Sequence, residues 1–198
     1  MRGILFVLSG PSGTGKGTVC NEIMMREDKL TISVSSTTRE KRIGETDGET
    51  YNYVSKDDFL GMIDRDEMLE YAIYNGNYYG TPKKTVEELL LDGKDVMLEI
   101  EPQGALQVKK LFPEAVLIFL VPPSMAELKN RLITRGRESD EEIEQRITNA
   151  KWELEQADKY TVLIENDDIE DCVCDVLDYI ESKRKERNKV NSLINENV

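Results

Sequence analysis

The sequence predicts an α/β fold, a doubly wound parallel sheet, and three observations support this class. Short apolar runs of strand length recur along the chain, stretches with helical spacing of apolar residues separate them, and a glycine-rich loop joins the first run to the first helical stretch. Strands buried on both faces of a parallel sheet have this continuous apolar character, and helices connect them. Ligands of such sheets bind at the carboxyl ends of the strands, where we expect the functional residues.

The strands are predicted from the apolar runs. Four near-continuous runs are 4–8 (ILFVL), 96–100 (VMLEI), 115–121 (AVLIFLV) and 161–166 (TVLIEN). A weaker run, 31–36 (TISVSS), predicts a fifth strand.

The helix starts are predicted from capping residues. Ser124 is a natural N-cap for a helix whose apolar residues begin at Met125. Ser139 and Glu142 predict a capping box at the start of the next helix. A third helical pattern begins at Ile169, so helices alternate with strands as the fold class requires.

Two segments interrupt this alternation. Residues 37–80 are rich in Thr, Tyr, Gly and charge, and they predict a small mixed α+β lobe with one short helix at 56–65. Residues 134–142 are polar and predict an exposed, mobile segment. The expected organisation is a core of 1–34, 92–133 and 151–187, an inserted lobe of 35–91, a lid of 134–150 and a disordered tail of 188–198.

The composition limits the classes of function. The 198 residues carry a net charge of −13, which disfavours nucleic acid and anionic membranes as partners. There is no apolar run of membrane-spanning length and no signal peptide, so we expect a cytoplasmic protein. The three cysteines do not suggest a disulfide framework, and the lack of histidine excludes histidine-based catalysis and histidine ligands for zinc.

Residues 10–18, GPSGTGKGT, predict a phosphate-binding loop of the P-loop NTPase type. They lie between an apolar strand and a helical stretch, the context that the G-x-x-x-x-G-K-[ST] motif requires. Glycines let backbone N–H groups converge on an anion, and Lys16 supplies a positive charge for the β- and γ-phosphates. The loop residues expected to bind ATP are Gly10, Pro11, Ser12, Gly13, Thr14, Gly15, Lys16, Gly17 and Thr18.

Gly17 stands where this motif usually has the hydroxyl ligand of magnesium. GTPases and motor-type ATPases rely on that ligand, whereas the G-K-G-T ending resembles nucleoside monophosphate kinases. Because Mg²⁺ keeps several waters, we expect the nucleotide phosphates and water to hold it without a direct protein ligand. Thr18 can still donate to a phosphate oxygen, so a kinase is expected rather than a switch.

Six further motifs make the chain similar to the guanylate kinase family. They are VSSTTREKRIGETDGETYNYVS (34–55), NYYGTP (77–82), LEIEPQG (98–104), VPPS (121–124), RGRES (135–139) and ENDD (165–168). The resemblance runs in order to about residue 181. It implies phosphoryl transfer from magnesium ATP to GMP, and to dGMP, and it makes 35–91 a GMP-binding lobe.

The resemblance also implies how the GMP phosphate is held. Arg39 and Arg42 match the arginines that grip this phosphate, and Tyr51 and Tyr79 match the tyrosines beside them. Planar guanidinium forks suit a phosphate dianion.

Guanine needs an acceptor for its N1–H and exocyclic amine and a donor for O6. Glu70, Ser35 and Thr81 match the carboxylate and hydroxyl positions of the family. Glu99 and Glu101 end a strand where many relatives have Asp-x-Asp. We expect one of these two to contact GMP or a magnesium-bound water, and the sequence does not say which.

Cations that close over the phosphates are expected to be the main catalysts, because phosphoryl transfer places negative charge on equatorial oxygens. Arginines 131, 135, 137 and 146 flank the polar segment. The resemblance implies that Arg135 and Arg146 act with Lys16 in catalysis. It also implies that Arg137 stacks on the donor adenine and that Asn166 lies near that base.

Three alternatives remain open. A kinase of a phosphorylated sugar, such as a ribose bisphosphate, would have no use for a guanine-reading carboxylate. A non-catalytic guanylate-kinase-like binding module typically lacks the intact loop, and a GTPase switch would carry the magnesium hydroxyl. ATP and GMP are therefore the expected partners, without nucleic acid or membrane, and the chain could be a monomer or a homodimer.

Overall fold

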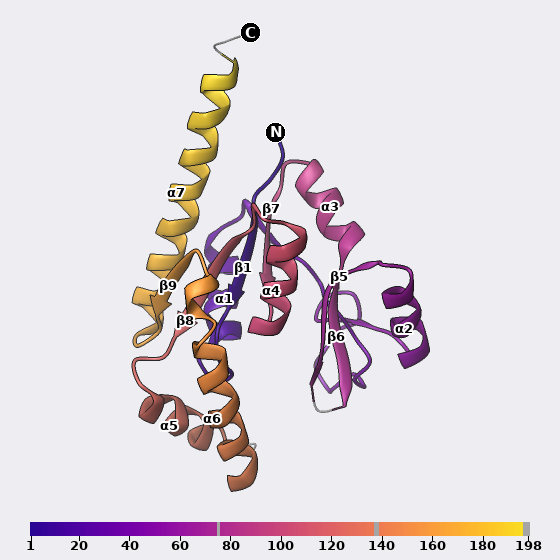
Figure 1. The fold of residues 1–198 in the computed structure, drawn as a ribbon, viewed down its shortest axis with the longest axis vertical. Helices are drawn as coiled ribbons and strands as arrows, with labels where there is room; N and C mark the ends of the chain where they lie inside the picture. The colour runs from indigo at the N-terminus through magenta and orange to yellow at the C-terminus, as the bar shows by residue number, and fades with distance from the viewer. Residues whose placement is uncertain (75, 137–138, 196–198) are drawn as a thin grey trace.

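The computed structural model describes residues 1–74, 76–136 and 139–195. Its larger sheet has five parallel strands in the order β2-β7-β1-β8-β9. These strands are β1 (Leu5–Ser9), β2 (Leu30–Ile32), β7 (Asp95–Glu99), β8 (Val116–Val121) and β9 (Val162–Glu165). The predicted doubly wound α/β class is confirmed, since the strands alternate with helices along the chain (Figure 1).

Alternate residues of β1 face opposite sides of the sheet and belong to two separate apolar cores. The covering helices are α3 (Lys83–Leu91) and α4 (Pro102–Leu111) on one face and α1 (Lys16–Arg26) and α7 (Ile169–Asn195) on the other. Leu5 and Val7 belong to the first core, and Phe6 and Leu8 to the second. All four are buried, and full burial of each such side chain contributes about 1.5–3 kcal/mol.

The weak apolar run at 31–36 does not form one strand. β2 ends at Ile32, and the Ser33 N–H still donates to Met97 O at 3.1 Å before the chain leaves the central sheet. β3 (Ser36–Thr37) then joins the second sheet. The sequence therefore indicated an extended segment, but not that two different sheets share it.

The mixed lobe is built on a four-stranded sheet in the order β4-β3-β6-β5. Its further elements are β4 (Asn52–Tyr53), α2 (Lys56–Asp64), β5 (Met68–Tyr74) and β6 (Asn77–Pro82). Phe59 of α2 is fully buried against Tyr78, with ring centroids 5.4 Å apart. The helix expected at 56–65 is confirmed, and Figure 1 shows the lobe on the α4 side of the molecule, away from α7.

Two helices follow β8, and both begin at the predicted caps. They are α5 (Met125–Arg135) and α6 (Asp140–Leu154), and a 3-10 turn (Ala157–Lys159) comes after them. Ser124 accepts a hydrogen bond from the Glu127 N–H, and Ser139 with Glu142 forms the complete capping box. Because α6 continues to Leu154, the expected end of the lid at residue 150 lies inside a helix.

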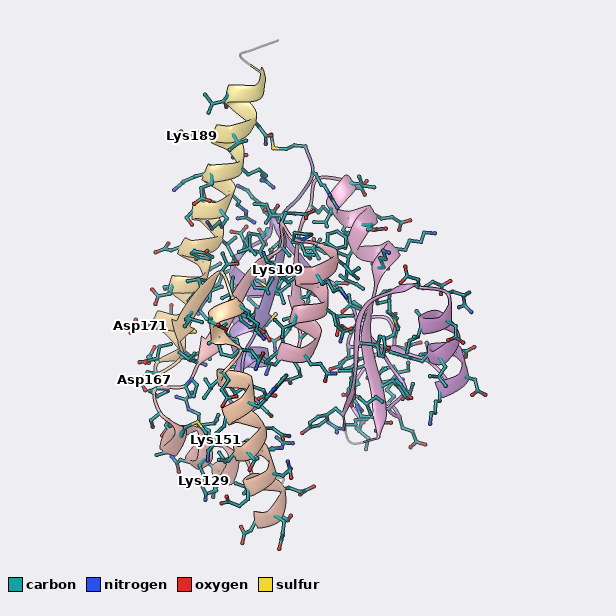
Figure 2. The ribbon with its side chains drawn as sticks, viewed as in Figure 1. Lys109, Lys129, Lys151, Asp167, Asp171 and Lys189 are labelled. Carbon is teal, nitrogen blue, oxygen red and sulfur yellow. The ribbon has the colours of Figure 1, made fainter. Side chains whose placement is uncertain are left out.

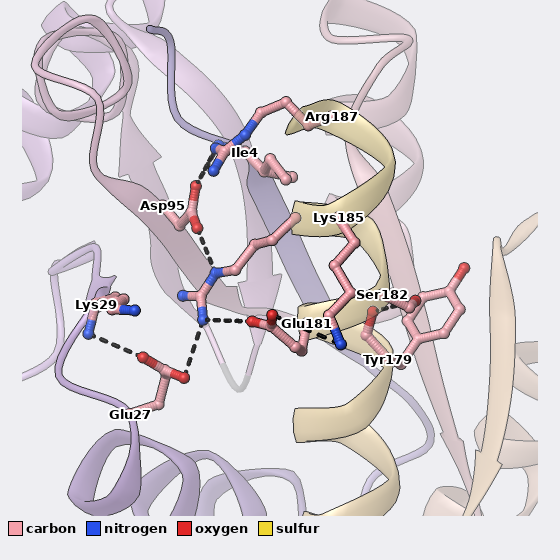
Figure 3. Close-up of polar contacts among 10 residues, drawn as sticks. Ile4, Glu27, Lys29, Asp95, Tyr179, Glu181, Ser182, Lys185 and Arg187 are labelled. Carbon is pink, nitrogen blue, oxygen red and sulfur yellow. Dashed lines mark hydrogen bonds and ion pairs between the residues drawn. The ribbon is translucent and has the colours of Figure 1, made fainter. Parts of the chain in front are cut away.

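Residues 188–195 of the tail predicted to be disordered are helical, because α7 continues to Asn195, and 196–198 lie outside the described residues. Asp95, at the start of β7, anchors this helix (Figure 3). Arg184 Nε and Arg187 Nη1 donate to the two carboxylate oxygens of Asp95, each at 2.7 Å. The basic run gave no sign of this, because its acidic partner lies 89 residues earlier in the sequence.

Charged side chains project from helices in all parts of the molecule. The lysines labelled in Figure 2 lie on four helices, Lys109 on α4, Lys129 on α5, Lys151 on α6 and Lys189 on α7. Lys129 pairs with Glu144 and so connects α5 to α6. Within the described ranges, no helix combines the length and the apolar character that crossing a bilayer requires.

Candidate active site

A cavity of about 1070 Å³ lies between the phosphate loop, the mixed lobe and helices α5 and α6. It brings together most of the predicted site residues, which come from distant parts of the sequence. The predicted residues that line it are Ser12, Gly13, Gly15, Lys16, Gly17, Thr18, Ser35, Arg39, Arg42, Tyr51, Glu70, Tyr79, Glu99, Glu101 and Arg146. One space therefore has the phosphate loop as one wall and the lobe as another.

Other predicted residues support the cavity from behind. The Pro11 carbonyl accepts hydrogen bonds from the N–H and the hydroxyl of Thr14, and the Gly10 carbonyl accepts one from Lys16. Asn166 is 4% exposed, and its Nδ2 donates to Thr14 O at 2.6 Å. The structure therefore places Asn166 against the phosphate loop, and its contact with adenine stays a prediction.

The phosphate loop needs glycine where it turns into α1. Gly15 has φ of 89°, in the left-handed region, and a Cβ there would lie 2.7 Å from Nδ2 of Asn166. The next residue, Lys16, begins the helix and is 7% exposed. Its Nζ donates to Gly10 O at 2.7 Å and to Glu101 Oε2 at 3.1 Å. The loop thus holds a buried positive charge beside the carboxylate of Glu101, the N-cap residue of α4, which lies two residues after β7 and so does not end the strand as predicted.

Gly17, the position without the usual hydroxyl, faces the Glu99 carboxylate. A Cβ at Gly17 would lie 3.6 Å from Glu99 Oε1, an ordinary contact, so space does not demand glycine here. Burial raises the pKa of Glu99 above its usual range. Among the residues that the structure describes, no cluster of three or more acidic, cysteine or histidine side chains could hold a metal alone. The oxygen donors of Glu99, Glu101 and Thr18 fit a magnesium ion that is held mainly by phosphates and water.

Arg39, predicted to grip the GMP phosphate, is held by a carboxylate that the sequence reading missed. Glu45 pairs with both terminal nitrogens of Arg39, at 2.7 and 3.0 Å. Glu45 also accepts hydrogen bonds from the Arg42 N–H at 2.7 Å and the Tyr53 hydroxyl at 2.8 Å. Hydrogen bonding to Arg39 lowers the pKa of Glu45 to about 2. The available signal was an acidic residue three positions after Arg42, which an ordinary surface carboxylate would also give.

The two predicted tyrosines complete this wall of the cavity. The rings of Tyr51 and Tyr79 lie 5.9 Å apart in an edge arrangement, and the Arg39 guanidinium carbon lies 5.7 Å from the Tyr51 ring centroid. Burial raises the pKa of Tyr51 to about 12, so its hydroxyl remains a donor at neutral pH. Two guanidinium groups and two phenols therefore face one end of the cavity.

Elsewhere on the lobe wall, Glu70 forms a chain with two hydroxyls, of which Thr81 is buried and Ser35 half-buried. The Glu70 side chain is largely buried, and Thr81 Oγ1 donates to Glu70 Oε1 at 2.7 Å. Ser35 Oγ lies 3.4 Å from Thr81 Oγ1. Burial raises the pKa of Glu70 to about 7. The structure thus brings the three residues of the predicted guanine reader into contact.

The lid arginines are described only in part. Arg146 of α6 lines the cavity, with Nη1 3.4 Å from Ser12 Oγ and its guanidinium carbon 5.8 Å from the Tyr74 ring centroid. Arg131 also lines it, and its Nη1 donates to Asn166 O at 2.8 Å. Arg135 ends α5, but its side chain lies outside the described part of the structure. Arg137 also lies outside the described residues, so its predicted stacking on adenine is not tested.

Glu153 is a second residue that the sequence reading missed. It lies in the last turn of α6, and its Oε2 accepts a hydrogen bond from the Ser12 N–H of the phosphate loop at 3.3 Å. Burial raises the pKa of this carboxyl, and the nearby Glu101 carboxylate raises it further. Nothing distinguished Glu153 from the other glutamates of an acidic helix, because its partner is a backbone group 141 residues away.

Known proteins of one family match nearly the whole chain. A family model described as guanylate kinase matches residues 2–183. The guanylate kinase of Bacillus subtilis (strain 168) is 55% identical over 175 residues, covering 88% of this chain and 85% of its own. That of Clostridioides difficile (strain 630) is 45% identical over 193 residues, covering 98% and 94%. A crystal structure of guanylate kinase from Anaplasma phagocytophilum has a TM-score of 0.75 and 32% identity, covering 92% of this chain and 86% of that one. The chain belongs to the guanylate kinase family.

Proposed function

We propose that this protein transfers the γ-phosphoryl group of ATP to the phosphate of GMP, and of dGMP, releasing ADP and the nucleoside diphosphate. One observation carries the proposal: a single cavity joins a phosphate loop to the proposed guanine-reading set, buried Glu70 and Thr81 with half-buried Ser35. Family membership supports it, because the relatives at 55% and 45% identity are named guanylate kinases.

On the donor side, loop residues 10–18 hold the triphosphate through backbone N–H groups, and Lys16 places its ammonium beside the β- and γ-phosphates. The phosphate oxygens replace the Gly10 carbonyl and the Glu101 carboxylate that Lys16 now contacts. Magnesium, when bound, neutralises charge on the phosphoryl oxygens. Glu99 and Glu101 would hold its waters, and Thr18 would donate to a phosphate oxygen. No general base is required, because the acceptor oxygen of GMP is already anionic.

On the acceptor side, Arg39, Arg42, Tyr51 and Tyr79 bind the GMP phosphate. The paired contact with Glu45 fixes the plane of the Arg39 guanidinium before the substrate arrives, so less side-chain freedom is lost on binding. The phosphate is thereby aimed at the loop, and holding two reactants in one orientation supplies much of the acceleration of such a transfer.

Guanine is read by Glu70 in its ionised form, which accepts hydrogen bonds from the N1–H and the exocyclic amine. Thr81 gives its only hydroxyl proton to Glu70, so Ser35 is the donor in the 3.4 Å contact with Thr81. When guanine binds, the Ser35 hydroxyl turns from Thr81 to donate to O6. Adenine has an acceptor nitrogen at N1, where guanine has N1–H. With adenine bound, the buried Glu70 carboxylate would therefore have no hydrogen-bond donor at that position. Discrimination of this type typically reaches several orders of magnitude.

Over the phosphates, Arg146 and Arg135 join Lys16 as the catalytic cations. Arg146 already contacts Ser12 of the loop, a position from which it can follow the γ-phosphoryl group. Arg137 and Asn166 are proposed for the adenine end of ATP. Closing α5 and α6 over the cavity would also exclude water and limit hydrolysis of ATP.

The alternatives explain fewer of these contacts. A sugar-phosphate kinase leaves the chain from Glu70 through Thr81 to Ser35 without a ligand. A binding module without activity leaves the intact loop and its buried Lys16 without a role. A cytoplasmic location, a monomeric or homodimeric state, and a lack of nucleic-acid and membrane partners stay predictions.

The test is an ADP-release assay with magnesium ATP and six acceptors: GMP, dGMP, AMP, UMP, CMP and ribose 1,5-bisphosphate. Turnover confined to GMP and dGMP is the expected result. Turnover with the sugar phosphate alone would keep the kinase and remove the guanine reader. A folded protein without turnover on any acceptor would contradict the proposed activity.

A further inference from the structure

Helix α4 meets the exposed edge of β5 through one side chain. β5 is the last strand of the lobe sheet, so the backbone groups on its outer edge have no neighbouring strand. Gln107 of α4 satisfies them: its Oε1 accepts from the Tyr71 N–H at 3.1 Å, and its Nε2 donates to Tyr71 O at 2.8 Å. The amide thus replaces a strand partner at the residue that follows Glu70.

One turn earlier, Gly104 meets Glu70 itself. A Cβ at Gly104 would lie 2.3 Å from Glu70 Oε2, too close for both to stay in place, and 3.0 Å from its Cδ, so the buried carboxylate would have to shift. Gly104 lies inside α4, where glycine is a poor helix former, so backbone conformation does not explain it. Glycine is required here because the Glu70 carboxylate occupies the space that a side chain would fill.

The start of the same helix reaches the phosphate loop. Glu101 is the N-cap residue of α4, and its Oε2 accepts from Lys16 Nζ at 3.1 Å. Three residues of one rigid element, Glu101, Gly104 and Gln107, therefore contact Lys16, Glu70 and Tyr71 in turn. Their spacing of three residues places them along one side of the helix.

We infer that α4 positions the guanine-reading carboxylate relative to the phosphate loop, with Gly104 and Gln107 as specificity-determining positioning residues for purine nucleotides that carry a 2-amino group. Gly104 leaves the space that the carboxylate needs, and Gln107 fixes the strand on which it stands. Neither residue touches the phosphoryl group that is transferred. The inference rests on the proposed function and assigns the selection of the base to a helix of the core as well as to the lobe.

The first test is Gly104→Ala, with steady-state kinetics on GMP, on inosine monophosphate, which lacks the 2-amino group, and on ATP. A displaced Glu70 should lower kcat/KM for GMP at least about tenfold. The loss should be smaller for inosine monophosphate, because this nucleotide makes only one of the two hydrogen bonds to Glu70 that GMP makes. KM for ATP should stay within about twofold. Gly61→Ala in α2 is the matched control, because its Cβ would meet only the flexible end of Arg65.

The second test is Gln107→Met, which keeps the size of the side chain and removes both hydrogen bonds to Tyr71. KM for GMP should rise about tenfold, while kcat and KM for ATP change little. Gln103→Ala, an exposed residue one turn earlier on the same helix, should match the wild type. Gly104→Ala combined with Glu70→Asp should lose less than the product of the two single losses, since the shorter carboxylate relieves the contact.

The outcomes separate this inference from the proposed function. Wild-type protein that does not phosphorylate GMP would overturn both. Wild-type turnover of GMP, with Gly104→Ala and Gln107→Met both keeping the wild-type ratio of GMP to inosine monophosphate, would overturn the inference alone. A loss of thermal stability in either variant without a change in that ratio would show a purely structural contact and would also overturn it.

Discussion

At the scale of single residues, the proposed selection of the base depends on a carboxylate that is costly to bury. Burial raises the pKa of Glu70 to about 7, although Thr81 donates a hydrogen bond to it. Leucine or methionine in its place would satisfy packing without that cost, so the carboxylate indicates a site of ligand recognition.

We predict that Glu70→Gln keeps the fold and lowers kcat/KM for GMP about 100-fold, because the amide turns a donor towards the donors of guanine. KM for ATP should remain within about twofold. Steady-state kinetics with each substrate varied in turn measures both values. Glu67→Gln, an exposed glutamate paired with Arg65, is the matched control. Wild-type GMP kinetics in the Glu70 variant would show that the base is read elsewhere.

The raised pKa of Glu70 also predicts a pH dependence. In the proposed binding mode Glu70 must be ionised to accept from guanine. The value of kcat/KM for GMP should therefore fall as the pH decreases below 7, with a slope that approaches about tenfold per pH unit. The phosphate of GMP also titrates, at about pH 6. Its effect is present in both proteins, so the difference between the wild-type and Glu70→Gln profiles reports Glu70 alone. Identical profiles for the two proteins would contradict the assignment.

The same shift has a defined sign for stability. Because the folded pKa is above the ordinary value of 4.5, stabilisation from protonated Glu70 is complete below pH 4.5 and is lost as the pH rises through about 7. Thermal unfolding should therefore show Glu70→Gln gaining stability relative to wild type between pH 5 and pH 8. An unchanged difference across that range would mean that the carboxyl is not buried as described.

A fourth prediction concerns the residue that holds Arg39. Glu45→Ala removes the paired contacts at 2.7 and 3.0 Å and should raise KM for GMP about tenfold, because Arg39 must then be ordered on binding. KM for ATP should not change. Glu49→Ala, a nearby exposed glutamate, is the control. Equal KM values for GMP in both variants would mean that Glu45 does not orient the clamp.

Residue identities in the site were predictable where a motif reports local chemistry. The loop around Lys16, the clamp at Arg39 and the reader at Glu70 were expected, and the structure gathers them around one cavity. Glu45, Glu153 and Gln107 were not expected, because each acts on a backbone group or a guanidinium that folding brings near. A single glutamate or glutamine in a polar stretch carries no sign of such a partner.

At the scale of elements, α7 shows how a polar contact fixes a helix to the sheet. Burial opposes the charge of Asp95, but the Ile4 N–H and two guanidinium groups outweigh burial and hold the pKa of Asp95 below its ordinary value. Arg184 Nη1 also donates to Oε2 of Glu27, the residue that follows α1, at 2.9 Å (Figure 3). These contacts tie α7, at Arg184 and Arg187, to the central sheet and to the end of α1.

We predict that Arg184→Met lowers the free energy of unfolding by about 3 kcal/mol, because it leaves part of a buried carboxylate without its partner. Urea unfolding followed by circular dichroism measures this. Lys185→Met, at the neighbouring exposed position, should have little effect. KM for GMP should be the same in both variants, since Asp95 lies at the opposite end of β7 from Glu99. Equal stability of the two variants would show that the Asp95 contacts do not anchor α7.

Among elements, the strands with long apolar runs and the helices with capping residues were predictable. The short strands at 31–36 and the helical chain end were not. Runs such as 115–121 are apolar throughout because the strand is buried on both faces. The run at 31–36 divides between two sheets, and α7 is anchored at Arg184 by a residue far away in sequence. Local patterns do not record such long-range pairings.

At the scale of the whole molecule, the proposed transfer requires that core, lobe and lid enclose two nucleotides with their phosphates facing each other. The cavity of about 1070 Å³ has all three as walls, and α4 runs from the loop to the lobe. The fold class and the order of the parts were predictable from sequence. Their mutual placement was not, because it depends on single contacts such as Arg146 with Ser12 and Gln107 with Tyr71.

The most direct test of one shared site is calorimetric titration with adenosine and guanosine joined through their 5′ oxygens by five phosphates. We predict one ligand per chain, bound at least about 100-fold more tightly than GMP alone, because the second half binds at a high effective concentration. Affinity should fall in both Lys16→Met and Glu70→Gln, and prior saturation with ADP and GMP should block the titration. A joined ligand that competes with only one of the two nucleotides would contradict a single cavity for direct transfer. An affinity that is unchanged by one of the two substitutions would contradict it as well.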